Sequence, residues 1–414
     1  MNVLDRPVPL PEPPPRRPDS HAAAPVSLEG VARLLSGLDR DQRRAVTHGE
    51  GPLMVVAGPG TGKTEVITRR VAWLIATKRA RPSEILALTF TDRAAAEMQA
   101  RVDVLVPYGR ADSAIHTFHA FGDRLLREFA FDLGLPSDPR VISRAEGVVL
   151  LREHLFELGL SQYLPLADPT RFLGALIDRV ARQKDEGITP AHVRAHAERA
   201  LAVASEALRI AEAADREGAE AAVTGAKGQL ELASASAVYE RLLLERGLID
   251  FGDQLALAHR LLRESPAVRF ELQRRFRYVI VDEFQDTNPL QLELLSLLAG
   301  PARNVTVVGD DDQSIYTFRG AAIDNILGFS RTFPGTRRIV LRRNHRSRAP
   351  ILAAADRLIH HNDPHRLAIA EDLDKRLTAV RRGRRPAPVR FETFGTATEE
   401  ADAIAGSIAD RMAG

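Results

Sequence analysis

Residues 53–64 read LMVVAGPGTGKT, and this stretch decides the fold. Its first five residues are apolar, which predicts a short buried strand, and apolar residues at helical spacing follow over 66–75. Between them, the segment from Ala57 to Thr64 matches a phosphate-binding loop, with Ala57 in place of the first glycine. Glycines let backbone N–H groups curl around phosphate oxygens, and a helix N-terminus adds positive potential. The alternative, a glycine-rich turn with an incidental lysine, leaves the flanking strand and helix unexplained.

Two side chains carry the chemistry predicted for this loop. Lys63 is expected to reach the β- and γ-phosphates of ATP, and Thr64 to offer its hydroxyl to Mg²⁺. The chain has 57 basic residues, and only five of them are lysine, at positions 63, 78, 184, 227 and 375. A lysine kept at the phosphate position of such an arginine-rich chain is more informative than usual.

A second cluster of charged residues follows another apolar run. Tyr278–Val281 predicts a buried strand, and Asp282 and Glu283 come directly after it. An acid at the carboxyl end of a strand beside a phosphate-binding loop is placed to hold Mg²⁺. The adjacent glutamate can serve as general base toward an attacking water. Taken alone, a strand ending in acids also fits a solvated strand end, but the loop at 57–64 favours the catalytic interpretation.

Strand and helix patterns alternate through much of the chain. Residues 85–90 and 305–308 are further short apolar runs, and Thr91 with Asp92 can cap a helix over 93–102. Short apolar strands alternating with helices predict an open parallel α/β sheet. Strand signals vanish between about 119 and 246. Long Ala- and Leu-rich helices are expected over 145–245, and the 200–237 stretch is interpreted as a solvated helical arm.

Composition excludes several classes of protein. The absence of cysteine rules out disulfides, thiolate zinc sites and cysteine nucleophiles, and fits a reducing cytoplasm. No apolar run approaches the roughly 18 residues of a membrane span, and the N-terminus lacks the apolar core of a secretory signal. We therefore expect a bacterial cytoplasmic protein without membrane contact. The net charge of +2 permits a nucleic-acid partner without requiring one.

The sequence resembles the UvrD/Rep family of superfamily 1 helicases from residue 38 to its end. Six segments carry the resemblance: 38–42 (LDRDQ) the Q motif, 88–98 (LTFTDRAAAEM) motif Ia, 117–119 (TFH) the next DNA-contacting motif, 248–253 (LIDFGD) the return into the first motor domain, 308–320 (VGDDDQSIYTFRG) motif III, and 341–347 (LRRNHRS) motif IV. Two departures are visible. Asp92-Arg93 stands where relatives usually carry Asn-Lys, and Phe318 where many carry Trp.

The resemblance implies that the chain is divided into motor domains of the RecA-like fold, which is a P-loop NTPase fold with a parallel sheet. The predicted parts are a disordered proline-rich tail (1–27), a first RecA-like segment (28–118), an inserted helical subdomain (119–246), a second segment of the same domain (247–335) and the start of a second RecA-like domain (336–414). A basic loop at 381–388 is expected to precede one more strand and a helix. Motifs V and VI of the family have no counterpart before Gly414, so we expect a fragment or a shortened protein.

The resemblance also implies roles for individual residues. Gln42 would read the adenine edge, Gln313 would contact the γ-phosphate, and Arg346 would reach it from the second motor domain. The residues predicted to be catalytic are Lys63, Asp282, Glu283, Gln313 and Arg346. Those predicted to bind the nucleotide are Gln42, Ala57, Gly58, Pro59, Gly60, Thr61, Gly62, Lys63, Thr64 and Arg70, with Thr64 and Asp282 as metal ligands. Those predicted to contact DNA are Phe90, Thr117, His119, Tyr316 and Phe318.

The implied function is an ATP-dependent DNA helicase that uses ATP and Mg²⁺. The resemblance implies 3′-to-5′ movement on single-stranded DNA, binding at single/double-strand junctions, a role in repair or recombination, and association with the nucleoid. Two alternatives stay open from the sequence. One is the motor subunit of an AddAB-type helicase–nuclease, and the other is a non-catalytic subunit that binds ATP and DNA. The intact Lys63, Thr64 and Glu283 argue against the non-catalytic alternative.

Overall fold

The computed structural model describes residues 28–106, 113–163, 168, 170–212, 215–316, 320–381 and 388–413. Three sequence predictions lie outside these ranges: the proline-rich tail 1–27, the DNA-contacting Phe318 and nearly all of the basic loop 381–388.

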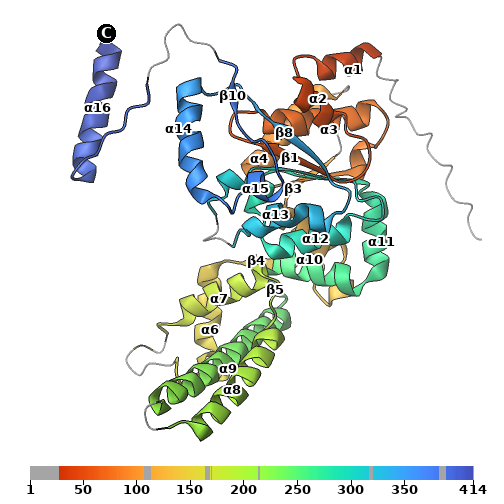
Figure 1. Cartoon of the computed structure of the whole chain (residues 1–414). Helices are drawn as coiled ribbons and strands as arrows, with labels where there is room; N and C mark the ends of the chain where they lie inside the picture. The colour runs from red at the N-terminus through yellow and green to blue at the C-terminus, as the bar shows by residue number, and fades with distance from the viewer. Residues whose placement is uncertain are drawn as a thin grey trace, which may run out of the picture.

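A six-stranded parallel sheet forms the centre of the larger body in Figure 1. Its strands are β1 (Leu53–Ala57), β2 (Ile85–Thr89), β3 (Ala114–Thr117), β6 (Tyr278–Val281), β7 (Val305–Gly309) and β8 (Arg337–Leu341). They are ordered β3-β2-β6-β7-β1-β8, and every neighbouring pair is parallel. The predicted α/β class with a parallel sheet is confirmed.

Helices cover both faces of the sheet, because alternate residues of each strand point to opposite sides. In β1, Met54 and Val56 belong to a first apolar core on one face of the sheet. Leu53, Val55 and Ala57 belong to a second core on the opposite face. The second core packs against α1 (Leu28–Leu35), α2 (Arg40–Val46), α3 (Lys63–Ala76) and α4 (Asp92–Leu105). The first packs against α5 (Phe118–Glu128), α10 (Asp253–Glu264), α11 (Pro266–Arg275), α12 (Pro289–Leu298) and α13 (Ile323–Thr332).

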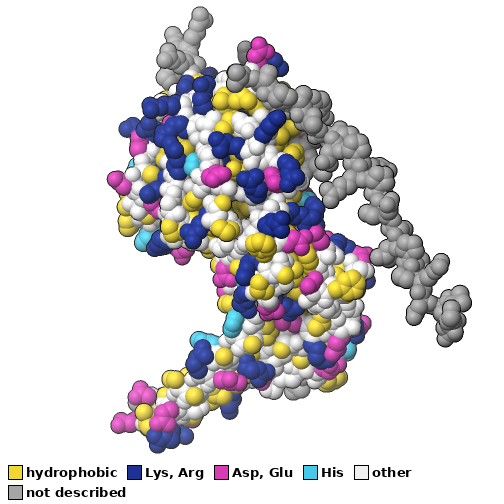
Figure 2. Space-filling view, turned by 90° about the vertical axis from the view of Figure 1, so that its right-hand side faces the viewer, with side chains coloured by type: hydrophobic (Ala, Val, Ile, Leu, Met, Phe, Trp, Pro, Cys, Tyr) yellow, Lys and Arg dark blue, Asp and Glu magenta, His cyan; other side chains and the backbone are white. Residues whose placement is uncertain are grey.

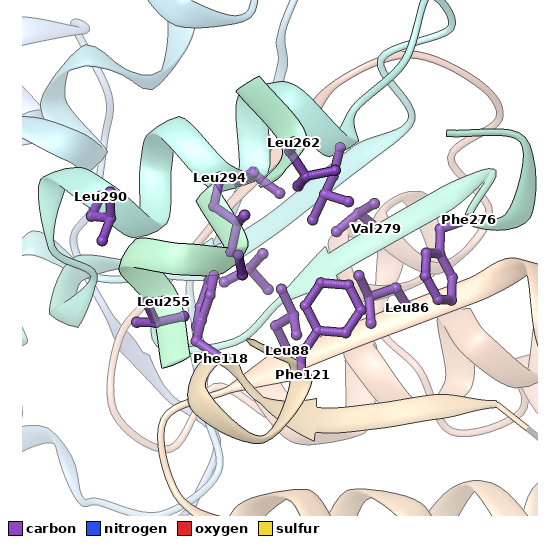
Figure 3. Close-up of a cluster of buried hydrophobic side chains, with 14 of the residues drawn as sticks. Leu86, Leu88, Phe118, Phe121, Leu255, Leu262, Phe276, Val279, Leu290 and Leu294 are labelled. Atoms are coloured by element: carbon purple, nitrogen blue, oxygen red, sulfur yellow. The ribbon is translucent and has the colours of Figure 1, made fainter. Parts of the chain in front are cut away.

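Figure 3 shows that α5 belongs to this first core. Phe118 and Phe121 pack beside Leu86 and Leu88 of β2. A Cβ added at Gly122 would lie 2.3 Å from the Gln254 carbonyl oxygen, so α5 and α10 are in backbone contact. The predicted start of the helical insertion at 119 is therefore wrong, because the apolar face of α5 is buried under the motor sheet.

The helical segment leaves and rejoins the body of the sheet through two adjacent strands. β4 (Arg140–Ile142) pairs in parallel with β5 (Leu248–Asp250). Between them lie α6 (Arg144–Glu153), α7 (Leu173–Asp185), α8 (Pro190–Ile210) and α9 (Arg216–Glu245). α8 and α9 pack side by side and project away from the sheet (Figure 1), and α8 buries only Ala197 and Ala204. The predicted solvated arm (200–237) is confirmed only in part: it is largely exposed up to residue 225, but beyond that α9 buries Ala226, Gly228, Ala233, Ala235 and Ser236.

The strand β8 corrects the predicted boundary between residues 335 and 336. It pairs with β1 from Arg337 to Leu341, so it is the sixth strand of the first sheet rather than the first strand of another. A separate block follows it. β9 (Arg343–Asn344) pairs with β10 (Thr378–Ala379), and α14 (Ala349–Ile359) and α15 (Leu367–Ala370) lie between them in sequence.

The end of the chain is only partly as predicted. Helix α16 (Ala397–Ala413) forms where a last helix was expected, with every side chain exposed and apart from the rest in Figure 1. The strand expected before it does not form in the described residues 388–396. These residues are exposed, and no described strand pairs with them.

Basic side chains are spread over the surface of the motor body. Figure 2 shows one face on which Lys and Arg are scattered across the rounded upper body, while the thin end of the helical arm carries both signs. Within the described ranges, no helix combines the length and apolarity that crossing a membrane requires.

Candidate functional site

The predicted motifs converge on one edge of the sheet, because each follows the carboxyl end of a parallel strand. They are 58–64 after β1, 90–92 after β2, 117–119 at the end of β3, 282–286 after β6, 310–316 after β7 and 342–346 after β8. Segments that are far apart in sequence thereby come to face the same space.

The loop between β1 and α3 requires glycine at two positions. Gly60 has φ +72° and Gly62 has φ +89°, both in the left-handed region. A Cβ at Gly60 would lie 2.5 Å from the Cβ of Arg346, and one at Gly62 would lie 2.8 Å from the Gln42 Nε2 atom. Gly62 is also the N-cap of α3 and supplies no side-chain cap. The helix therefore presents its first-turn N–H groups to the loop, as an anion site requires.

Lys63 lies at the centre of the site. Its Nζ atom is 2.6 Å from Glu283 Oε2 and 3.3 Å from Gln313 Oε1. Three segments that the sequence predicted to share one site are thus joined through one ammonium group. Glu283 neutralises the charge of Lys63.

The Asp282 carboxyl is buried at the end of β6. Burial, reinforced by the neighbouring Glu283 carboxylate, raises the pKa of Asp282 to about 7, although Lys63 opposes the shift. A divalent cation would relieve this destabilised carboxylate. Mg²⁺ takes oxygen ligands, and Asp282 together with the Thr64 hydroxyl in the first turn of α3 is such a set. The residues therefore fit Mg²⁺.

Gln285 is a site residue that the sequence did not single out. It is 2% exposed, its Nε2 donates to Glu283 Oε2 (2.9 Å), and its Oε1 accepts from the Asp310 N–H (3.0 Å). Gln285 therefore ties the acid pair after β6 to the segment after β7. Glu283 itself has φ +49°, a left-handed conformation that a non-glycine residue holds only when its surroundings fix it. The one available sequence signal was the place of Gln285 in a segment that holds three acids, Asp282, Glu283 and Asp286.

The predicted contacts of Gln42 with adenine and of Arg346 with the γ-phosphate remain predictions, but both residues lie beside the loop 57–64. Gln42 Nε2 donates to the Thr61 carbonyl oxygen (2.9 Å). Arg346 is exposed beside Gly60, and the adjacent His345 N–H donates to the Gly60 carbonyl oxygen (2.8 Å). A cavity of about 910 Å³ extends from the loop into the block after β8, lined by Pro59, Gln313, Asn344 and Lys375 among others.

Arg70 is a correction to the predicted nucleotide site. Its guanidinium is buried and donates to the carbonyl oxygens of Ala45, Val46 and His48 and to the Thr306 hydroxyl. These bonds tie α3 to the end of α2 and to β7. Arg70 therefore stabilises the fold and does not contact the loop that would hold a nucleotide.

Two aromatic pairs lie along the same edge of the sheet. The rings of Phe90 and Tyr316 are 5.4 Å apart and tilted, and Phe90 is 37% exposed. The His119 ring stacks at 3.9 Å on Phe251, which is 60% exposed and was not among the predicted DNA contacts. Phe90, His119 and Phe251 line one cavity of about 450 Å³ between the motor sheet and the insertion. Exposed aromatic faces of this kind suit base stacking.

Thr117 serves the fold in a way the sequence did not indicate. Its hydroxyl oxygen accepts the Ala120 N–H (3.1 Å) and caps α5, and its side chain is largely buried. The predicted DNA contact at Thr117 therefore stays a prediction.

The stacked imidazole makes the protein sensitive to acid. Burial lowers the pKa of His119 to about 4, although the nearby Asp92 carboxylate opposes part of this shift. Because the unfolded imidazole binds protons near pH 6.5, stability is fully present above that value and is lost as the pH falls towards 4. We expect His119 to cost about 1.4 kcal/mol of unfolding free energy on going from pH 7.5 to 5.5.

Urea unfolding of the wild type and of His119→Phe at the two pH values measures this loss. The variant keeps the stacked ring and should lose about that much less stability at pH 5.5. The exposed His361 provides the control, as His361→Gln should behave like the wild type. Equal acid sensitivity in His119→Phe and the wild type would contradict the assignment.

The parallel sheet, the glycine loop before α3 and the acids after β6 together define a P-loop NTPase fold. The model of the UvrD/REP helicase N-terminal domain matches residues 38–334. This chain belongs to the UvrD/REP helicase family.

Curated relatives agree with this assignment. The chain is 35% identical to DNA helicase II of Escherichia coli (strain K12) over 80% of its own length and 42% of the relative. It is 35% identical to ATP-dependent DNA helicase PcrA of Bacillus subtilis (strain 168), over 80% of this chain and 40% of the relative. A third relative, DNA helicase II of Haemophilus influenzae, is 33% identical over 92% of this chain and 47% of the relative. The chain thus spans less than half the length of these relatives.

Proposed function

We propose that this protein hydrolyses Mg·ATP and uses the energy to move along single-stranded DNA as part of a DNA helicase. One observation carries the proposal. Gln313, whose Oε1 accepts from Lys63, and Tyr316, whose ring packs on Phe90, lie three residues apart on one segment. A change at the phosphates can therefore reach the aromatic surface through a short, direct path. The names of the curated relatives support the same activity.

ATP binding would rearrange the contacts of Lys63. Phosphate oxygens would accept from the N–H groups of the loop and of the first turn of α3, and Lys63 would leave Glu283 for them. Glu283, 35% exposed at its side chain, is then available to take a proton from water. Asp282 and Thr64 would hold Mg²⁺, which neutralises charge that develops on the phosphates. Gln285 keeps Glu283 in place throughout.

The aromatic edge supplies a contact with DNA that does not depend on sequence. Every base has a π-face, so stacking on Phe90, Tyr316 or Phe251 tolerates any base, as a motor moving along arbitrary DNA requires. We further propose 3′-to-5′ movement, preference for single/double-strand junctions, and a repair or recombination role in the bacterial cytoplasm near the nucleoid. These finer features rest on the family resemblance.

The decisive experiment is ATP hydrolysis by this 414-residue chain with and without single-stranded DNA. We expect hydrolysis that rises on addition of oligo(dT) and depends on Mg²⁺. Hydrolysis that is absent or indifferent to DNA, in a protein that binds the oligonucleotide, would favour the non-catalytic alternative.

Phe90 should contribute directly to DNA affinity. Removing its ring in Phe90→Ala deletes a stacking face and the ring contact with Tyr316. We expect a loss of about 1–3 kcal/mol in oligo(dT) binding with the fold intact, measured by fluorescence anisotropy. Phe156→Ala is the control, because Phe156 is 93% exposed on the insertion away from this edge. A lower melting temperature with unchanged DNA affinity would make Phe90 a packing residue.

A further inference from the structure

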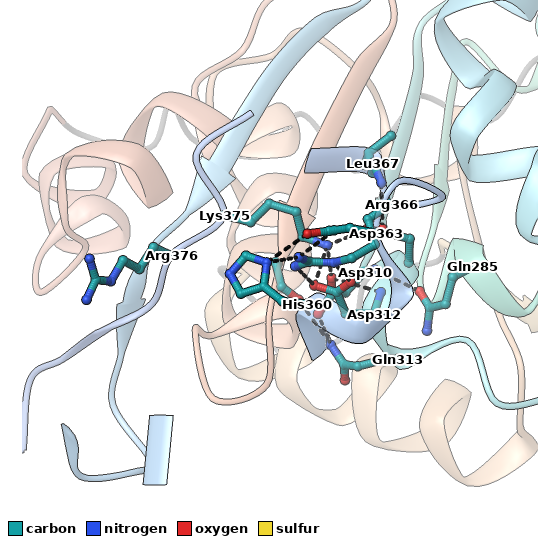
Figure 4. Close-up of polar contacts among 12 residues, drawn as sticks. Gln285, Asp310, Asp312, Gln313, His360, Asp363, Arg366, Leu367, Lys375 and Arg376 are labelled. Carbon is teal, nitrogen blue, oxygen red and sulfur yellow. Dashed lines mark hydrogen bonds and ion pairs between the residues drawn. The ribbon is translucent and has the colours of Figure 1, made fainter. Parts of the chain in front are cut away.

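A buried ion cluster joins the segment after β7 to the block after β8 (Figure 4). Lys375 Nζ lies 2.7 Å from Asp310 Oδ1 and 2.8 Å from Asp312 Oδ2, and it also contacts Asp311. Arg366 forms a two-pronged pair with Asp312, with N···O distances of 2.7 and 2.8 Å. The carboxylates of Asp310, Asp311 and Asp312 are therefore matched by two cations that lie 54 to 65 residues further along the chain, and Arg366 also pairs with its neighbour Asp363.

The cluster is well shielded from water. The side chains of Lys375, Asp310 and Asp311 are 7%, 3% and 1% exposed. Burial alone lowers the pKa of the Lys375 ammonium, but Asp310 and Asp311 outweigh it and hold the pKa above its usual value. The ammonium thus takes the place that a metal ion could occupy among three adjacent carboxylates. Because a buried carboxylate without a cation is strongly destabilised, the three acids depend on Lys375 and Arg366.

One member of the cluster also holds the glutamine at the nucleotide site. Asp310 uses Oδ1 for Lys375 and Oδ2 for the Gln313 Nε2 group, at 2.8 Å. With its Nε2 held there, the other end of the Gln313 amide, Oε1, faces Lys63 Nζ at 3.3 Å. The Asp310 N–H donates to Gln285, so the backbone at this point is fixed as well. A continuous series of contacts therefore runs from Lys375 through Asp310 and Gln313 to Lys63.

We propose that Lys375 is a positioning residue for γ-phosphate recognition, acting through Asp310 to orient the amide of Gln313. This inference deepens the proposed function and rests on it. Without the ammonium, Asp310 would be a buried carboxylate lacking its cation. Its side chain would no longer be held in place from the Lys375 side, and once it turns away it no longer accepts from Gln313 Nε2. Since Lys375 comes from the block after β8, recognition of ATP becomes sensitive to the position of that block.

The consequence is selective for ATP over ADP. ADP lacks the phosphate that Gln313 is placed to contact, so its binding needs only the loop, Lys63 and the metal ligands. Loss of Lys375 should therefore weaken binding of an ATP analogue and leave ADP binding nearly unchanged. A purely structural role for Lys375 would instead weaken both nucleotides together, because it would disturb the whole cleft.

Fluorescent nucleotide titrations of the 414-residue chain test this with Mg·ADP and a non-hydrolysable Mg·ATP analogue. Lys375→Met keeps the apolar stem and removes the charge. We expect its preference for the ATP analogue over ADP to fall about tenfold, as for one lost hydrogen bond to a charged group. Lys375→Arg, which keeps the charge, should restore most of the preference. Lys227→Ala, at an exposed lysine of α9, should match the wild type.

A double-mutant cycle with Gln313→Ala shows whether Lys375 acts through that residue. In the Gln313→Ala background, adding Lys375→Met should cause no further loss of preference. If Lys375→Met does not fold, the isosteric Asp310→Asn interrupts the same series, because its single amide oxygen cannot accept from both Lys375 Nζ and Gln313 Nε2, and it should show the same selective loss.

The possible results distinguish a failure of the positioning role of Lys375 from a failure of the proposed function. A wild type that binds neither nucleotide contradicts the proposed function and, with it, this inference. A wild type that binds both, with an unchanged preference in Lys375→Met or in Asp310→Asn, overturns the positioning role alone. So does an equal loss for ADP and the ATP analogue, or additive losses in the cycle.

Discussion

A Lys63→Ala variant is expected to lose most of its affinity for Mg·ATP. Truncating one partner of a buried, charged hydrogen-bonded pair typically costs about 2–5 kcal/mol, or roughly 30- to 4,000-fold in Kd. Here the loss has two sources. The phosphates would lose their ammonium partner, and Glu283 would lose the cation that lies 2.6 Å from it in the free protein. The Asp282 carboxyl, whose pKa Lys63 lowers, would then be still harder to ionise for Mg²⁺.

Titration with a fluorescent ATP analogue in the presence of Mg²⁺ measures this loss. Lys227→Ala is again the matched control, because it removes a lysine from an exposed helix of the insertion. Circular dichroism should show that Lys63→Ala remains folded. If the variant binds the analogue as tightly as the wild type does, the assignment of the nucleotide site is wrong.

The parts of the fold that could be predicted were those encoded locally. The apolar runs at 53–57 and 278–281 become the buried strands β1 and β6 with the predicted bounds. Thr91 caps α4 as expected, by accepting the Ala94 N–H (3.1 Å). Because parallel strands present their carboxyl ends at one edge, the motifs that follow them meet there. The convergence of Lys63, Glu283 and Gln313 on one point was therefore implicit in the sequence.

What could not be predicted depends on which elements pack together. Residues 337–341 would form a strand whether they belonged to the first domain or to the second. Only their pairing with β1 assigns them to the first sheet. Helix α5 carries no local signal of the domain it belongs to, and only the burial of its apolar face by α10 and β2 assigns it to the body of the sheet. Arg70 lies close to the loop in sequence, yet α3 turns its side chain towards the carbonyl groups at 45–48. Such partners are distant in sequence, and local patterns do not reveal them.

Three of the five lysines of this chain, and not only the one in the loop, form ion pairs that are shielded from water. Lys63, Lys184 and Lys375 have side chains that are 13%, 4% and 7% exposed, and each pairs with carboxylates. Lys184 of α7 contacts Asp250 and Asp253, both at 2.7 Å, where the insertion rejoins the motor body. Three of the five lysines therefore lie at internal contacts between segments, whereas Lys78 and Lys227 are exposed. A compact ammonium suits these sites, because it can contact two or three carboxylates at once.

Glu283→Gln should bind Mg·ATP and hydrolyse it about 10²- to 10⁴-fold more slowly, the usual contribution of a general base. The amide keeps the shape of the carboxylate and an oxygen that can accept from Gln285, but it cannot take a proton from water. Nucleotide binding should survive because Lys63 and Asp282 are untouched. Removing the Glu283 charge also removes one cause of the raised pKa of Asp282, so the Asp282 carboxyl should ionise more readily.

Single-turnover hydrolysis of labelled ATP, with saturating oligo(dT), separates this chemical step from binding and product release. Glu271→Gln is the matched control, because Glu271 is exposed on α11. Its hydrolysis rate should equal that of the wild type. Glu283→Gln should instead trap bound ATP, and the same protein should retain its affinity for single-stranded DNA. Single-turnover hydrolysis by Glu283→Gln at close to the wild-type rate would exclude Glu283 as the base. The proton would then have to pass to another group at the edge. Asp286 is the next candidate, because burial, followed by the Glu283 charge, raises its pKa to about 6.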